Sequence, residues 1–185
     1  MKYFYILISV SILLSSCSNP SELSKNFNCN ETNIKSQKVV LDYKRNFKLA
    51  IPTNWKTQLY FSEYESEIFT ADTIKELTKT FILVTSFNLG SLNFDARFHQ
   101  KKDSLLSRND LELIKEGNQL FLSKSAYWYV AKGIKNGYTY HQFNLSLKQS
   151  ENTYFNAYSE IYGDTLVNNR ICQTISILEK VEFLQ

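Results

Sequence analysis

Residues 126–147 have the sequence AYWYVAKGIKNGYTYHQFNLSL, and this stretch decides the fold. Its centre, Asn136-Gly137, predicts a tight hairpin turn, because this dipeptide tolerates the positive φ angles of a type I′ turn. Strand-forming residues flank the turn on both sides, and in the returning segment Phe143 and Leu145 alternate onto one face. The stretch therefore predicts an antiparallel hairpin.

Further strand patterns precede and follow this hairpin. Pro52 cannot donate a hydrogen bond to a neighbouring strand, so we expect it to end the strand that begins at Phe47. The predicted strands are residues 39–43, 47–51, 56–61, 65–70, 80–87, 111–115, 120–123, 126–134, 138–147 and 153–162.

Two segments change to a helical period. In residues 91–108 the apolar residues Phe94, Phe98 and Leu105 are four and seven positions apart, which places Lys102 on the outward face. The order of strands, helix, antiparallel strands and helix predicts an α+β fold, with an antiparallel sheet of six or more strands and helices packed on its faces. The apolar stripe of the last helix is Val167, Ile171, Ile175 and Leu178.

The N-terminal segment has the features of a secretory signal. A single lysine precedes an apolar run at residues 3–14, which is shorter than the roughly 20 residues that span a bilayer. The sequence Leu14-Ser15-Ser16-Cys17 resembles the lipobox of bacterial lipoproteins. That resemblance implies removal of residues 1–16, attachment of lipid to Cys17, and an anchor in the cell envelope.

The chain after the signal is long enough for one domain. The polar residues 18–36 show no helical or strand period, so we expect the lipidated cysteine and a tether over residues 17–36, and a single domain over residues 37–185. Loss of Lys2 with the signal leaves 20 of the 21 basic residues against 18 acidic ones. This balance lacks the clustered basic field of a nucleic-acid binder, so no nucleic-acid partner is expected.

The cysteines predict a disulfide. With Cys17 assigned to the anchor, Cys29 and Cys172 remain as a pair, and disulfides persist in the envelope. Such a bond would join the start of the domain to the last helix. Two free thiols are the alternative, and a nucleophilic Cys172 with His141 as its base would compete for the same sulfur.

Residues 47–55, FKLAIPTNW, resemble the opening of PsbP/Mog1-like domains, which have an apolar strand, a proline, two further residues and a tryptophan. The same order of elements continues to the closing helix, so the resemblance covers residues 39–185 and implies a single α/β/α sandwich. Members of this family bind protein partners: one branch assists photosystem II and another binds a small GTPase. None of their partner-binding residues is matched here, so the resemblance implies a fold and no activity.

The sequence carries no catalytic motif. His99 and His141 do not stand at metal-ligand spacing, and the five glycines form no nucleotide-binding or hydrolase motif. We therefore expect no catalytic residue, metal or cofactor. Glu63, Glu65 and Glu67 alternate and would share one face of a strand, where they either bind Ca²⁺ or form a solvated edge.

Tyrosine is concentrated in the second half of the chain. Its rigid apolar ring with a polar tip suits a binding face for a protein or a glycan, but tyrosine also fills the space beneath a helix. Both alternatives stay open. The seven tyrosines of this candidate face are Tyr127, Tyr129, Tyr138, Tyr140, Tyr154, Tyr158 and Tyr162.

Three Asp-Ser/Thr-apolar triplets resemble the O-glycosylation sites of Bacteroidetes envelope proteins. The resemblance marks Thr73, Ser104 and Thr165 as glycosylation candidates. Asp72 and Asp164, the first residues of two of these triplets, also precede predicted helical segments, where a capping side chain is expected.

These features together predict a lipoprotein of the cell envelope, anchored in the outer membrane through its N-terminal lipid and facing the periplasm. The expected role is that of a non-catalytic binding or accessory module for a protein or an envelope ligand. The alternatives are an enzyme with a site of scattered polar residues around Glu63, Glu65 and Glu67, and a purely structural component of the envelope.

Overall fold

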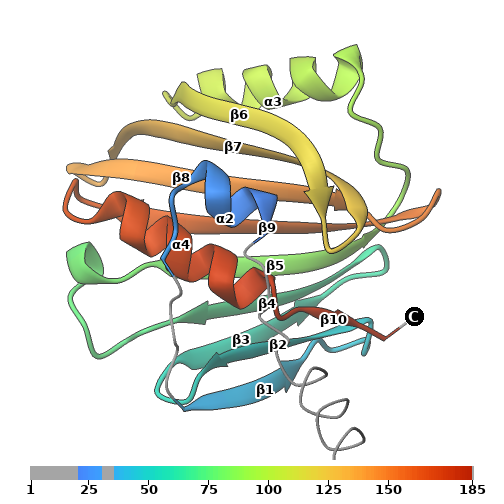
Figure 1. Cartoon of the computed structure of the whole chain (residues 1–185), viewed down its shortest axis with the longest axis horizontal. Helices are drawn as coiled ribbons and strands as arrows, with labels where there is room; N and C mark the ends of the chain where they lie inside the picture. The colour runs from blue at the N-terminus through green and yellow to red at the C-terminus, as the bar shows by residue number, and fades with distance from the viewer. Residues whose placement is uncertain (1–20, 31–35, 185) are drawn as a thin grey trace, which may run out of the picture.

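A seven-stranded antiparallel sheet forms the centre of the protein (Figure 1). The structure, a computed structural model, describes residues 21–30 and 36–184. The strands in their order across the sheet are β3 (Lys56–Phe61), β4 (Glu65–Ala71), β5 (Ile82–Leu89), β9 (Thr153–Tyr162), β8 (Tyr138–Lys148), β7 (Lys124–Lys135) and β6 (Glu112–Phe121).

A second, three-stranded sheet lies beside the first. Its strands, in the order β1-β2-β10, are β1 (Gln37–Leu41), β2 (Phe47–Pro52) and β10 (Glu182–Phe183). The helical elements are α2 (Glu22–Asn26), the single 3₁₀ turn η2 (Leu77–Lys79), α3 (Ala96–Arg108) and α4 (Val167–Leu178). The predicted α+β class, with helices on an antiparallel sheet, is confirmed.

The predicted central hairpin is confirmed as β7 and β8. Lys135 pairs with Tyr138, and Asn136 and Gly137 between them have φ angles of 53° and 80°. Both residues of the turn are therefore in the left-handed region, which Asn and Gly adopt at the lowest cost. Pro52 is the last residue of β2, as its missing N–H predicted.

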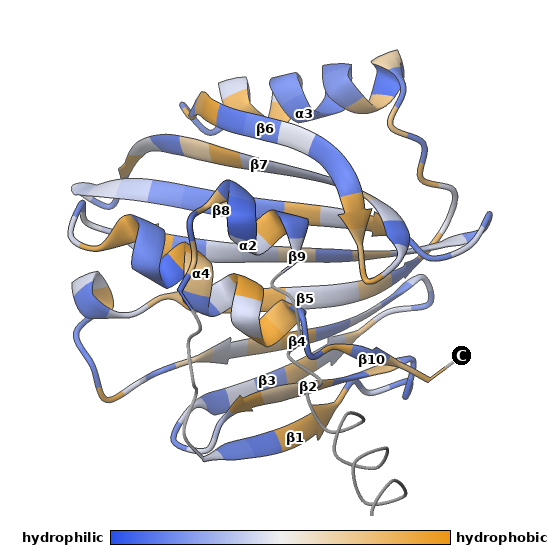
Figure 2. Ribbon diagram, in the orientation of Figure 1, coloured by the Kyte–Doolittle hydropathy of each residue, from blue (hydrophilic) through white to orange (hydrophobic). Residues whose placement is uncertain are grey.

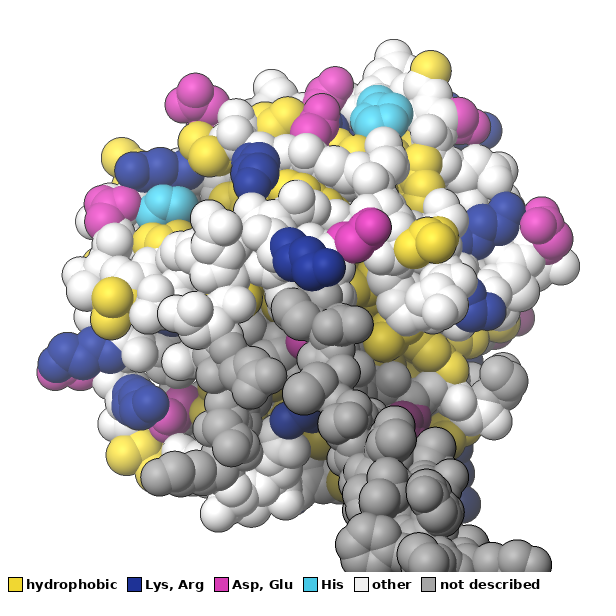
Figure 3. All heavy atoms as spheres, in the orientation of Figure 1, with side chains coloured by type: hydrophobic (Ala, Val, Ile, Leu, Met, Phe, Trp, Pro, Cys, Tyr) yellow, Lys and Arg dark blue, Asp and Glu magenta, His cyan; other side chains and the backbone are white. Residues whose placement is uncertain are grey.

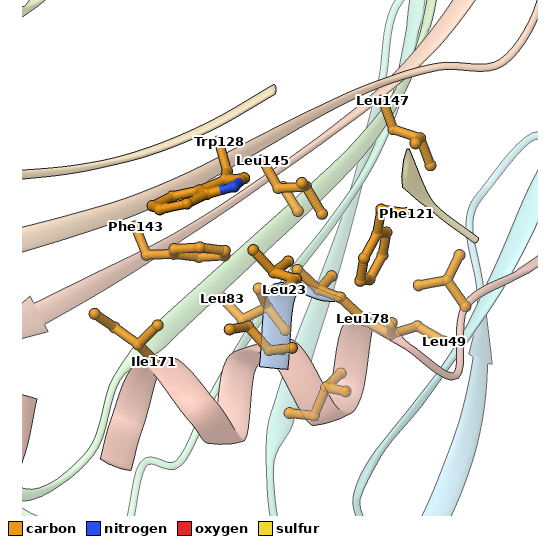
Figure 4. Close-up of a cluster of buried hydrophobic side chains, with 14 of the residues drawn as sticks. Leu23, Leu49, Leu83, Phe121, Trp128, Phe143, Leu145, Leu147, Ile171 and Leu178 are labelled. Carbon is orange, nitrogen blue, oxygen red and sulfur yellow. The ribbon is translucent and has the colours of Figure 1, made fainter. Parts of the chain in front are cut away.

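The main core lies between one face of the seven-stranded sheet and a layer made of α2, α4 and the smaller sheet. The inward residues of β8 recur at every second position, because side chains of a strand alternate between faces. The stripe of α4 meets them from the other side, and Figure 4 shows Ile171 and Leu178 turned toward Phe143, Leu145 and Leu83. The ribbon of α4 alternates apolar and polar residues, whereas α3 is mostly polar (Figure 2).

The folded domain begins earlier than the sequence predicted. Residues 21–30 were expected to belong to the tether, but they form α2 and pack into the core. Leu23 has no exposed surface and points between the sheet and α4 (Figure 4). The ring of Phe27 lies 5.0 Å from that of Trp128, and the hydroxyls of Ser21 and Ser24 both donate to Glu179.

The predicted disulfide joins Cys29 to Cys172, with 5.3 Å between the two Cα atoms. It connects the segment after α2 to the middle of α4. The alternative of two free thiols is therefore excluded, and so is a catalytic thiol at Cys172.

Helix α3 lies on the opposite face of the main sheet, over β6 and β7 (Figure 1). The sequence placed Lys102 outward and Leu105 inward, and this was wrong. Lys102 is only 6% exposed and Leu105 is 49% exposed. The buried side of the helix is the row Phe98, Lys102 and Leu106, four residues apart, with Asp95 as the N-cap.

Two further expectations need correction. The segments 111–115 and 120–123 are one strand, β6, with a bulge between Leu113 and Lys115. The N-cap residue of α4 is Leu166, which has a left-handed φ of 52° and makes no side-chain cap hydrogen bond, so neither Asp164 nor Thr165 caps the helix. Within the described residues, no helix is both long and apolar enough to cross a membrane.

Candidate functional site

Helix α3 leaves much of its side of the main sheet uncovered. Side chains that point to this side come from the central strands and align in register across them. We call this group the open sheet face. Its three cross-strand rows are Glu65, Asn88 and Tyr154; Glu67, Ser86 and Asn156; and Phe69, Val84 and Tyr158.

The seven tyrosines of the predicted binding face lie in different environments. Tyr127 and Tyr129 are buried beneath α3, which is the packing that the sequence left open as the alternative. Tyr154 and Tyr158 are half-buried on the open sheet face, so of the tyrosines described so far only these two remain candidates for a binding face.

The remaining three tyrosines lie at the end of the sheet, next to the β7–β8 turn. Tyr140 and Tyr162 are buried, with ring centroids 5.2 Å apart, whereas Tyr138 is exposed. The hydroxyl of Tyr162 donates to Glu160, which also pairs with Lys135 at 2.8 Å. The charge of Glu160 is therefore balanced by Lys135 at this end of the sheet.

The open sheet face carries an uncompensated acidic pair. Glu65 and Glu67 lie two positions apart on β4, and neither takes part in an ion pair among the described residues. Burial and the neighbouring Glu65 carboxylate raise the pKa of Glu67. Glu63 lies in the β3–β4 turn, so the predicted ladder of three carboxylates is a pair. No group of three or more His, Cys, Asp or Glu in the described chain is arranged to hold a metal ion.

A polar network holds α3 on the sheet. The Lys102 Nζ lies 2.5 Å from Glu116 Oε2, and the hydroxyl of Tyr127 donates to the same carboxylate. Burial lowers the pKa of Lys102, but its bonds to Glu116 and Tyr127 outweigh burial and raise it. Burial and the bond to Glu116 raise the pKa of Tyr127 to about 12, so this phenol stays protonated and does not act as a base at neutral pH.

The two histidines stand apart from the open sheet face. His141 is buried on β8, with its Nε2 3.6 Å from Asp164 Oδ1, and burial together with Lys132 lowers its pKa. The ring of His99 on α3 contacts that of Tyr127 at 5.1 Å.

The three glycosylation candidates are all exposed. Asp72 and Asp164, which precede two of them, have different roles. The Asp72 carboxylate accepts from the backbone N–H of Ile74 and Lys75, but the helical turn predicted to follow it is not formed, and the 3₁₀ turn η2 begins later, at Leu77. Asp164 instead pairs with Lys132 at 3.2 Å.

Charged side chains of both signs are interspersed over the face seen in Figure 3, with neither sign gathered into one field.

The open sheet face lies on the other side of the main sheet from α2 and α4. Residue parity on β4 reveals Glu65 and Glu67, and the pairing of β4 with β5 places Asn88 opposite Glu65. The pairing of β5 with β9 then adds Asn156 and Tyr158 to the same face.

Comparison with known proteins identifies the fold. No protein-family model matches the sequence, and no curated protein matches it. The solution structure of cyanobacterial PsbP (CyanoP) from Synechocystis sp. PCC 6803 superposes with a TM-score of 0.55 at 10% identity, over 84% of this chain and 96% of that one. The Ran-binding protein Mog1p of Saccharomyces cerevisiae gives a TM-score of 0.56 at 8% identity, over 81% and 96%.

The chain is thus an α+β protein with the PsbP/Mog1-like fold, as the FKLAIPTNW segment predicted. At these levels of identity the likeness establishes the fold alone, since one fold supports many unrelated functions.

Proposed function

We propose that this protein is a lipid-anchored, non-catalytic binding module of the bacterial cell envelope, which recognises a protein partner through the open sheet face. The observation that carries the proposal is the acidic pair Glu65 and Glu67, which forms no ion pair among the described residues and shares the open sheet face with the half-buried Tyr154 and Tyr158. Their charges favour a partner segment that presents lysine or arginine.

The chemistry of the face fits such a segment. Two like charges on one strand repel each other, and a cation placed between them relieves that repulsion while replacing the water lost on binding. Tyr154 and Tyr158 supply rigid contact area at a small entropy cost, and the amides of Asn88 and Asn156 supply donors and acceptors. The Asn156 Oδ1 is buried and has no hydrogen-bond partner among the described residues.

The envelope location is supported by the Cys29–Cys172 disulfide, because such bonds persist in oxidising compartments. Cys17 and the signal segment lie outside the described residues. Metabolic labelling with palmitate tests the anchor: wild-type chain should take up label and fractionate with membranes, and Cys17→Ala should do neither. Wild-type chain that stays unlabelled would refute lipidation.

A photo-crosslinking amino acid at Phe69 tests the binding face in the native envelope. We expect a protein adduct from position 69 that is lost when Glu65→Lys and Glu67→Lys are combined. Leu120, which is exposed on β6, serves as the control crosslinking position. Glu112→Lys, also on β6, serves as the control charge reversal.

The outcomes separate the alternatives. Adducts that survive the double charge reversal, or that form equally from position 120, would contradict recognition by the acidic pair. Adducts that contain polysaccharide and no protein would replace the protein partner by a glycan.

A further inference from the structure

A cleft of about 750 Å³ opens where three segments meet: the β2–β3 turn, the β4–β5 connection and the first turns of α4. This volume is within the range of small-molecule sites. We call it the Arg170 cleft. The residues that the argument uses are Trp55, Lys75, Lys79, Phe81, Leu166 and Arg170.

The floor of the cleft is apolar. The rings of Trp55 and Phe81 meet edge to face with centroids 4.9 Å apart, and Ile177 of α4 lies beside them. All three side chains are more than nine-tenths buried, so they are fixed by the core. An apolar or aromatic group that packs on them would release water, and little conformational entropy would be lost because these protein side chains are already ordered.

Arg170 brings a positive charge to the wall of the cleft. It is 4% exposed, and its guanidinium donates only to backbone carbonyls, those of Thr80, Tyr162, Gly163 and Thr165. No carboxylate of the described chain pairs with it, and its Nε has no hydrogen-bond partner there. Because water is excluded from the guanidinium, its field is weakly screened and extends into the cleft.

Three other features add positive potential at the same place. The N-cap residue of α4, Leu166, makes no side-chain cap hydrogen bond, which leaves the N–H groups of the first turn and the positive end of the helix dipole beside the cleft. Lys75 and Lys79 stand on the rim with side chains 64% and 69% exposed. Asp72, which also lines the cleft, is engaged by backbone N–H groups.

Nearby acidic residues neutralise the charges of Lys75 and Lys79 only in part. Glu76 pairs with Lys79 at 3.0 Å but is itself exposed, and the Lys75–Asp72 distance is 3.8 Å. The Glu76–Lys79 pair is exposed on both sides, so it is weak and exchanges readily with water. Asp72 is buried, but it lies near the limit of ion-pair distance from Lys75 and its carboxylate is already engaged by backbone N–H groups. The lysines are therefore available to an anion that approaches Arg170.

We propose that the Arg170 cleft binds a small ligand that carries a carboxylate or phosphate group on an apolar body. The anionic group lies against Lys75, Lys79 and the first turn of α4, and the apolar body covers Trp55 and Phe81. The site is independent of the open sheet face.

Arg170 also ties the β4–β5 connection and the end of β9 to α4, so its substitution would test folding more than binding. The exposed lysines are better targets. Uniformly ¹⁵N-labelled full-length chain in a non-ionic detergent is titrated with phenyl phosphate, and with inorganic phosphate and phenol as separate arms. The chain has two tryptophans, and the indole N–H of Trp128 donates to Gln119 in the core, so it serves as an internal reference for Trp55.

We expect a saturable shift of the Trp55 indole signal with phenyl phosphate and no shift of the Trp128 signal. Lys75→Gln combined with Lys79→Gln should weaken binding about fivefold, the effect of losing two exposed charge contacts. Lys101→Gln combined with Lys180→Gln, at exposed lysines elsewhere, should leave it unchanged.

Three results would overturn the proposal. The first is the absence of saturation with phenyl phosphate. The second is binding of phenol or of inorganic phosphate as tight as that of phenyl phosphate, since either would show that one half of the ligand is not recognised. The third is an affinity that the Lys75 and Lys79 substitutions do not change.

Discussion

Replacement of Leu23 by alanine tests whether residues 21–30 belong to the folded domain. Leu23 is 0% exposed, and the substitution removes about three methylene-sized groups from the core, worth about 2.4 kcal/mol at 0.8 kcal/mol each. The cavity that remains adds to this cost, and buried Leu→Ala changes cost about 2.7–5.0 kcal/mol. A short helix can shift to fill part of the space, so we expect a loss of about 3 kcal/mol.

The assay is urea unfolding of the full-length chain in a non-ionic detergent, followed by circular dichroism with the disulfide intact. A loss of this size corresponds to a fall in Tm of about 6–12 °C for a domain of this length. Lys25→Ala is the matched control, because Lys25 is exposed on the same helix and its loss should change stability by less than about 0.5 kcal/mol.

The result that would refute the reasoning is a Leu23→Ala chain as stable as Lys25→Ala. Such a result would mean that α2 does not pack on the sheet in solution. The Leu23→Ala and Lys25→Ala chains should also be compared without the disulfide, because the Cys29–Cys172 bond links this segment to α4 covalently and could hold it there without packing.

Three further predictions concern stability. Removal of the disulfide by Cys29→Ser with Cys172→Ser should lower the free energy of unfolding in urea by up to about 5 kcal/mol, since the bond closes a loop across 143 residues. Glu67→Gln should raise Tm at pH 7 but not at pH 3. The pKa of Glu67 in the folded state is raised above 4.5, so the folded state loses stability as the pH rises through that pKa. A Tm difference between Glu67→Gln and wild type that persists at pH 3 would contradict this reasoning. Gly133→Ala should cost about 1–3 kcal/mol in thermal melts, because its Cβ would lie 2.6 Å from the carbonyl oxygen of Asp110, and an unchanged Tm would exclude the clash.

The sheet could be predicted from the sequence because its signals are local. The Asn136-Gly137 turn and the period of two in β8 are properties of neighbouring residues, and the four-residue steps of α4 are equally local. Helix α2 has five residues with a single fully buried leucine, so it leaves no period to detect. Strand β10 has two residues, which are too few to show the period of a strand.

The orientation of α3 and the composition of the open sheet face depend on contacts distant in sequence. Lys102 faces inward because Glu116 of β6 lies beneath it, and nothing in the helix itself indicates this. The order β4-β5-β9-β8 sets which polar residues become neighbours, and in it β5 pairs with β9 although residues 90–152 separate them in the sequence. Residue type alone therefore found seven tyrosines, whereas register selects Tyr154 and Tyr158.

The early start of the folded domain sets how far the protein extends from a membrane. With Cys17 as the proposed anchor, only three residues separate it from Ser21, and a fully extended chain spans about 14 Å between those two positions. If Cys17 carries the lipid, the side of the molecule that carries α2 would be held near the headgroups, and the open sheet face, on the far side of the sheet, would point away from the bilayer. A partner of this face would have to come close to the membrane, because a connection of three residues would keep the domain near the bilayer surface.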